Sequence, residues 1–171
     1  MQHATALAQS LLADPPSLEQ RMEAGKALRD TVPRESHSAF ARQPGVDPLR
    51  ILHEQARTRR RELIPVRYAR MLQSPFAFLR GSAAVMAADL SSTPTTDLQV
   101  EVCGDMHVAN FGVFASAERQ LVFAINDFDE TQIGPWEWDI KRLVASAFVA
   151  AKHLGAGRSD RPRLCHSRRC A

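Results

Sequence analysis

The sequence predicts an α+β fold, in which short β-strands lie between a helical first half and one long helix. Three observations predict it: capped helical segments before residue 90, three β-type runs between residues 98 and 125, and a long apolar helical pattern after them. The chain has 171 residues, with 44% hydrophobic and 24% charged side chains, which is ordinary for a globular protein. We therefore expect one hydrophobic core.

Residues 1–62 are predicted to form a helical N-terminal region. Ser17 and Gln20 match a capping box, in which each side chain bonds the backbone amide of the other and fixes a helix start. Asp47 precedes Pro48, and an N-cap Asp followed by proline predicts the start of a second helix.

The second predicted helix ends in a run of three arginines at residues 59–61. Because cations suit the negative end of a helix dipole, we interpret this run as a solvated helix end, with phosphate binding as the alternative. Pro65 then opens a third helix, which Ser74 and Pro75 should end. Small apolar residues at 82–90 predict a short buried helix.

Three β-type runs follow, at residues 98–103, 111–114 and 121–125. The segment ASAERQ suits a hairpin turn between the second run and the third. The clearest helix of the chain is then predicted over Trp138–Leu154, with Gly155 just after its C-terminal cap.

Polar side chains gather after two of the predicted strands. The segments CGDMHVAN and NDFDE together hold six candidate site residues: Asp105, His107, Asn110, Asp127, Asp129 and Glu130. If the first and third strands are neighbours, these carboxylates lie close together and raise one another's pKa unless a cation intervenes. Carboxylate and amide oxygens suit Mg²⁺, which usually also takes water and phosphate oxygens. The plain alternative is a set of turn residues.

The order of these residues resembles the protein-kinase-like superfamily: an Asp, an Asn five residues later, a hairpin, then Asp-Phe. The GD-x-H-x-x-N form is similar to the aminoglycoside phosphotransferase branch. The segments RYARMLQSPFAFLRG, CGDMHVANFGVF and FAINDFDETQIGPWEWDIKRLVAS resemble the bacterial family called domain of unknown function 2252 over residues 63–154. The resemblance implies a partial, truncated kinase-like C-lobe there, with helices around a short antiparallel hairpin region carrying the catalytic loop.

By this resemblance, ATP and Mg²⁺ would be the cofactors of phosphoryl transfer to a hydroxyl group on a small molecule or a protein. Asp105 would be the catalytic base, and His107 would orient the loop or touch phosphate. Asn110 and Asp127 would hold Mg²⁺, and Asp129 would serve a second metal or the substrate.

Three further residues receive roles from the same resemblance. Asp139 would brace the catalytic loop from the start of the following helix. Arg67 and Arg80 would contact phosphate or, as the favoured alternative, form structural ion pairs that brace the acidic site.

A glycine-rich loop with a phosphate-binding lysine, which should cover the nucleotide, is not found before Asp105. In the resembled family these segments follow the equivalent of Leu154, where this sequence becomes polar and rich in arginine. We therefore interpret the chain as an inactive fragment whose tail, residues 155–171, is disordered or frameshifted. A zinc site in the tail segment CHSRRC would be one ligand short.

Composition narrows the expected partners and compartment. The segment after Gly155 carries a net charge of +4 and the rest of the chain about −1, so nucleic acid is not an expected partner. The sequence shows no signal peptide, no apolar stretch of membrane-spanning length and an odd number of cysteines, which together predict a cytoplasmic protein. Two other functions stay open: a metallophosphoesterase, which the D-x-H pattern at Asp105 suggests, and a non-catalytic module that holds a metal or nucleotide.

Overall fold

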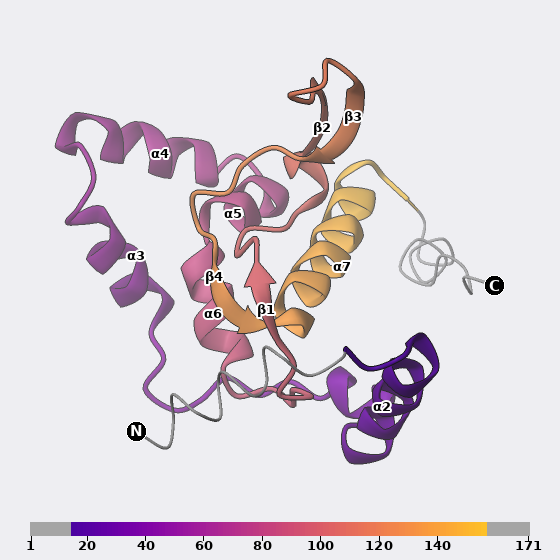
Figure 1. Ribbon diagram of the computed structural model, residues 1–171. Coiled ribbons are helices and arrows are strands. Elements are labelled where there is room, and N and C mark those ends of the chain that lie inside the picture. Colours follow the sequence, from indigo (N-terminus) through magenta and orange to yellow (C-terminus); the bar gives the residue numbers. More distant parts are fainter. Residues whose placement is uncertain (1–14, 157–171) are drawn as a thin grey trace, which may run out of the picture. The chain divides into compact units, whose positions relative to one another are not determined.

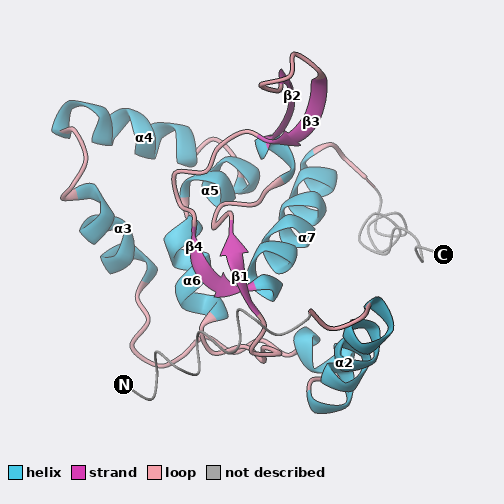
Figure 2. Cartoon of the chain, in the orientation of Figure 1, coloured by secondary structure: helices cyan, strands magenta, loops and turns pink. Residues whose placement is uncertain are grey.

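The computed structural model describes residues 15–156, which contain six α-helices and two small antiparallel sheets (Figures 1 and 2). The predicted α+β class is confirmed. The chain divides between Ser38 and Ala39 into two compact units. None of the helices in the described range has the length and apolar character that a membrane crossing requires. The predictions for the tail from residue 157 onward lie outside this range.

The first unit holds helix α2 (Leu18–Thr31) and the 3₁₀ turn Arg34–Ser38. The predicted capping box is present: Gln20 N donates to Ser17 Oγ at 3.2 Å, and Ser17 N donates to Gln20 Oε1 at 2.8 Å. None of the residues of α2 is buried.

The second unit begins with four short helices: α3 (Pro48–Ala56), α4 (Ile64–Met71), α5 (Pro75–Gly81) and α6 (Ala83–Leu90). Side-chain caps start two of them, because Asp47 accepts from Leu49 N at 2.9 Å and Ser74 accepts from Ala77 N at 3.0 Å. The helix predicted through residue 61 ends earlier, at Ala56.

The apolar core of this unit is small. Leu52 of α3, Met71 of α4 and Val85 of α6 are buried together, with Ile51 and Tyr68 packed against them. This cluster joins α3, α4 and α6.

Two pairs of strands follow. Strand β1 (Gln99–Val102) pairs with β4 (Gln132–Pro135), and β2 (Phe111–Ala115) forms a hairpin with β3 (Leu121–Ile125). The three predicted strands are present, whereas β4 was not foreseen. The segment between β1 and β2, residues 103–110, is called the first loop below, and residues 126–131, between β3 and β4, form the second loop.

The chain then enters helix α7 (Trp136–His153), which packs against α5 and β1. Its end is fixed as predicted: Gly155 has φ +79°, Gly155 N donates to Lys152 O, and Ala156 N donates to Ala151 O. The sequence predicts a long apolar pattern for this helix, but most of the buried residues of α7 are polar or charged: Glu137, Asp139, Arg142 and Ser146.

We predict that Leu52→Ala lowers the free energy of unfolding by about 2–4 kcal/mol, because it leaves a cavity among the buried side chains. Leu49→Ala, on the exposed side of the same helix, should change it by about 0.5 kcal/mol or less. Urea unfolding followed by circular dichroism measures both, and equal losses would contradict this account of the core.

Candidate functional site

Strand pairing places the first and second loops side by side. At one end, β1 pairs with β4 so that Val102 lies opposite Gln132. At the other end, the hairpin sets Phe111 opposite Ile125. Both loops are therefore closed at both ends by paired strands. The assumed pairing of the first and third strands is not the one observed, yet the expected closeness of the loops results from these two other pairs.

Asn110 joins the two loops through its side-chain amide. Nδ2 donates to the carbonyl oxygens of Asp105 at 3.3 Å and Asp127 at 3.1 Å, and Oδ1 accepts from Asp127 N at 3.0 Å. The thiol of Cys103 adds a further link at 3.4 Å to the Asp127 carbonyl, and burial raises its pKa, which keeps it in the donating form. These contacts fix Asp105 and Asp127 relative to each other.

Helix α7 holds the start of the first loop through Asp139. Its Oδ2 accepts from Cys103 N at 2.7 Å, and its Oδ1 accepts from Gly104 N at 3.1 Å. Gly104 has φ +77°, and a side chain there would collide with the backbone carbonyl of Glu130. The hydrogen bonds of Asp139 are the brace that the family resemblance implied.

A second residue of α7, Arg142, holds the side chain of Asp105. The guanidinium is almost fully buried, and both Nε, at 2.7 Å, and Nη2 donate to Asp105 Oδ1. Nη2 also donates to Leu79 O at 2.7 Å. Among the described residues, Asp105 Oδ2 accepts no hydrogen bond, so it is the carboxylate oxygen left available to a ligand.

Ser146 of α7 holds the end of the first loop. Its Oγ accepts from Val108 N at 3.0 Å and donates to Leu143 O at 2.7 Å, within the same helix. The side chain has no exposed surface. Helix α7 therefore contacts the first loop at its start, at the Asp105 side chain and near its end.

His107 is buried beside Asp105. Its Nε2 lies 3.7 Å from Asp105 Oδ2, and its ring meets Phe76 edge-on. Burial lowers the pKa of His107, and Arg142 and Arg80 lower it further, while Asp105 acts in the opposite direction. The imidazole is therefore neutral at pH 7, and its Nδ1 has no hydrogen-bond partner in residues 15–156.

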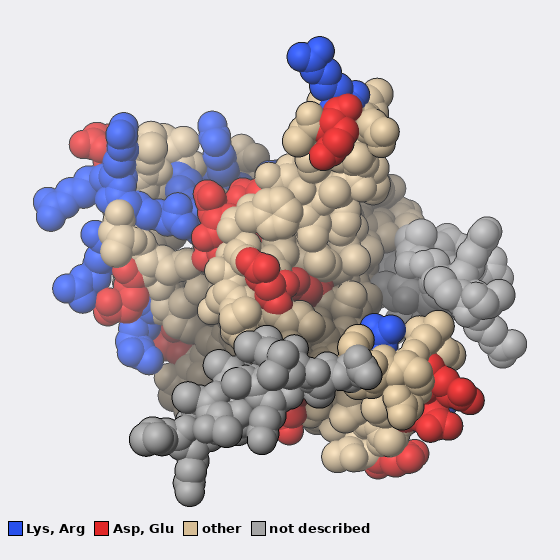
Figure 3. Space-filling model, in the orientation of Figure 1, with Lys and Arg blue, Asp and Glu red and all other residues tan. Residues whose placement is uncertain are grey.

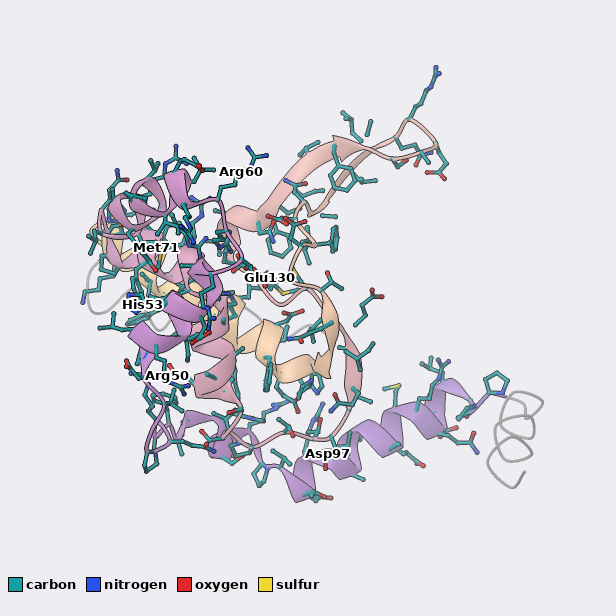
Figure 4. The ribbon with its side chains drawn as sticks, turned by 90° about the vertical axis from the view of Figure 1, so that its left-hand side faces the viewer. Arg50, His53, Arg60, Met71, Asp97 and Glu130 are labelled. Carbon is teal, nitrogen blue, oxygen red and sulfur yellow. The ribbon has the colours of Figure 1, made fainter. Side chains whose placement is uncertain are left out.

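The two loops form one side of a pocket of about 920 Å³. Four carboxylates line this side: Asp105, Asp127, Asp129 and Glu130. Five arginines line the other side, which we call the arginine wall: Arg59, Arg60, Arg67, Arg70 and Arg80. In Figure 3, basic side chains gather over α3 and α4, next to acidic ones. Figure 4 shows Arg60 and Glu130, one from each side of the pocket.

Arg67 and Arg80 both border the pocket. Arg67 is half-buried and donates to Gly81 O at 2.5 Å, while Arg80 is exposed. Burial is the main cause that lowers the pKa of Arg67, and the charge of Arg59 adds to it. Neither Arg67 nor Arg80 lies within ion-pair distance of a described carboxylate, although the charges of Glu130 and Asp105 act against the lowering of the Arg67 pKa.

The predicted metal ligands do not form a ready-made cage. Among residues 15–156, no three His, Cys, Asp or Glu side chains converge as a ligand set. Asp127 and Asp129 border the pocket, and Asp127 Oδ1 accepts from Asp129 N at 3.1 Å. Asn110 lies behind them with its amide engaged by the loops. This donor set fits Mg²⁺ bound through one or two carboxylates, water and phosphate oxygens, and it does not fit a site made only of protein ligands.

Sequence reasoning missed Arg142 and Arg70, and for Arg59 and Arg60 it favoured a solvated helix end over phosphate binding. Arg142 follows Asp139 by three residues, a spacing that places both on one helix face and could have revealed it. Arg59 and Arg60 were interpreted as a solvated helix end, but α3 ends before them and they border the pocket. Arg70 carries no sequence signal that separates it from an ordinary surface arginine.

Comparison with known families covers the same region. A family described as "Uncharacterized protein conserved in bacteria (DUF2252)" matches residues 59–169. The chain belongs to this family. The DUF2252 match contains both loops, α7 and every residue that lines the pocket except Gln55. No match was found among curated proteins or among solved structures.

We predict that Asp139→Ala lowers the free energy of unfolding by about 2–4 kcal/mol, because two backbone amides at the start of the first loop lose their acceptor. Asp139→Asn keeps one acceptor oxygen and should lower the free energy of unfolding by a smaller amount. Glu101→Ala, at an exposed position of β1, is the control and should change little. Urea unfolding measures the three variants; an Asp139→Ala protein as stable as the parent would refute the brace.

The lowered pKa of His107 predicts that stability falls as pH drops below about 6.5, the usual His value. The unfolded chain then binds a proton that the buried imidazole resists, until the pH reaches the folded-state pKa. His107→Gln should flatten this part of the stability curve, whereas His53→Gln, at an exposed position of α3, should not. Unfolding in urea between about pH 5 and pH 8 tests this, and an unchanged slope in His107→Gln would count against it.

Proposed function

We propose that the pocket is the metal–phosphate half of an ATP- and Mg²⁺-dependent phosphotransferase site that acts on a hydroxyl group. The observation that carries this proposal is the Asn110 contact, which holds Asp105 and Asp127 on one side of a pocket whose other side is the arginine wall. Carboxylates that share a pocket with guanidinium groups suit a ligand that brings both a cation and phosphates.

The order of elements supports the kinase-like part of the proposal. Strand β1, the loop with Asp105 and Asn110, a β-hairpin and the loop with Asp127 follow one another as in the resembled superfamily. The following helix begins with Asp139, whose contacts to the first loop match the bracing role that the resemblance assigns to it.

Each site residue has a role that its contacts permit. Asp105 Oδ2 would accept the proton of the attacking hydroxyl, whose oxygen bonds the terminal phosphorus as the bridging P–O bond breaks. Arg142 would orient that carboxylate through Oδ1. His107 would support the loop as a neutral, buried imidazole.

Mg²⁺ would supply charge neutralisation of the phosphates when bound. Asp127 and Asp129 are the pocket carboxylates that would hold it, and the second lone pair of Asn110 Oδ1 is the further donor in reach of the second loop. Arg67 and Arg80 would contact the phosphates. The acceptor would be a small molecule or a protein, and the expected compartment is the cytoplasm.

A second candidate is a module that holds a metal–nucleotide complex without turnover. Two observations favour it: no lysine borders the pocket among the described residues, and Asp105 Oδ1 is already bound to Arg142. Both candidates require binding of the metal–nucleotide complex, whereas only the first requires transfer. The test for this chain is therefore binding, with transfer as a separate measurement.

We expect Mg²⁺ and ATP together to raise the melting temperature more than either one alone, because the metal links the carboxylates to the phosphates. Asp127→Asn should weaken Mg²⁺-dependent ATP binding by roughly tenfold or more. Glu101→Gln removes the same charge at an exposed position that does not line the pocket, and should leave binding unchanged. Calorimetric titration measures the affinity for Mg²⁺–ATP in each protein. A parent chain that does not bind Mg²⁺–ATP would refute both candidate functions.

A further inference from the structure

The arginine wall holds more positive charge than its own surroundings neutralise. In residues 15–156 none of its five members forms an ion pair with a carboxylate. On the facing side, Asp105 is bound by Arg142, which does not line the pocket. The wall arginines therefore form no ion pair with the acidic loops, although the charges of Glu130 and Asp105 raise the pKa of Arg67.

Arg67 is the clearest example of a wall arginine without an ion-pair partner. It is half-buried, and its one hydrogen bond among the described residues goes to the neutral carbonyl of Gly81. Burial and the nearby charge of Arg59 both disfavour its charged form. The charges of Glu130 and Asp105 act in the opposite direction, and an anion bound in the pocket would favour the charged form of Arg67 further.

The chemistry and size of the pocket narrow the class of anion. Guanidinium groups bind phosphate and carboxylate in a bidentate manner, and a cluster of them suits a ligand with several such groups. A volume of about 920 Å³ corresponds to a small molecule rather than to a folded macromolecule. The proposed function assigns Arg67 and Arg80 to the nucleotide phosphates, which leaves Arg59, Arg60 and Arg70 as the wall members without an assigned partner.

We propose that Arg59, Arg60 and Arg70 of the arginine wall bind anionic groups of the acceptor. The acceptor would be a small polyanion that carries phosphate or carboxylate groups beside its hydroxyl. The assignment of this ligand as the acceptor rests on the proposed function. The binding of a small polyanion by the wall does not, because it needs neither the metal nor the nucleotide.

The first experiment measures polyanion binding by calorimetry in low-salt buffer with EDTA. Inositol hexakisphosphate and tripolyphosphate are the probes, and inositol is the neutral control. The double variant Arg59→Gln/Arg70→Gln should weaken binding by about tenfold or more. The matched variant Arg57→Gln/Arg61→Gln removes the same charge from neighbouring positions that do not line the pocket, and should change affinity by about twofold at most. No saturable binding, or equal losses in both variants, would overturn the proposal.

The second experiment separates the two sources of anionic groups. With saturating Mg²⁺–ATP present, the polyanion should still bind, which supports an acceptor site beside the nucleotide. Full competition would show that the wall serves the nucleotide phosphates and would overturn the acceptor assignment. Tight binding of a single-stranded oligonucleotide without binding of the small probes would overturn the small-molecule class.

The same measurements keep this inference distinct from the proposed function. Asp127→Asn should lose Mg²⁺–ATP binding and keep polyanion binding in EDTA. A parent chain that binds the polyanion but not Mg²⁺–ATP would refute the phosphotransferase proposal. It would still support the arginine wall as an anion-binding site. A parent chain that binds Mg²⁺–ATP and no polyanion would refute the inference alone.

Discussion

The carboxylate of Asp139 accepts hydrogen bonds from two backbone amides at the start of the first loop. The rest of the site depends on these two hydrogen bonds. Asp139, Arg142 and Ser146 follow one another at three and four residues and so share one face of α7. They hold the loop at its start, at Asp105 and at Val108. Buried polar groups are stable only when their hydrogen bonds are satisfied, so this face of α7 selects one conformation of the loop.

The pairing of the strands explains why the two acidic loops converge although the β2–β3 hairpin separates them in the sequence. Each loop runs between an end of the β1–β4 pair and an end of the hairpin. The strands thus determine where the loops begin and end, and Asn110 fixes what lies between them. An amide can do this because it carries both donors and an acceptor, which a carboxylate of the same shape does not.

The sequence predicted the helix starts at Ser17 and Asp47 because the capping side chains act on amides only a few residues away. It also predicted the two acidic loops, since Asp and Asn after a β-type run mark a strand end. Strand β4 was missed because QIGP is short and contains a glycine and a proline. Arg142 was missed because a charge next to an apolar helix pattern usually faces solvent. The spacing from Asp139 indicates a shared helix face, but the partner of Arg142 on the first loop, Asp105, lies 37 residues away in the sequence.

The hairpin also has a practical consequence. Its base is fixed at Phe111 and Ile125, where it meets the loops, while its turn at residues 116–120 lies at the far end and is exposed at most positions. A change of length at the turn therefore leaves the register at the base unaltered. A fluorescent label or a short peptide tag inserted there would report on this protein from outside its pocket, and relatives can differ in this turn without moving Asp105 or Asp127.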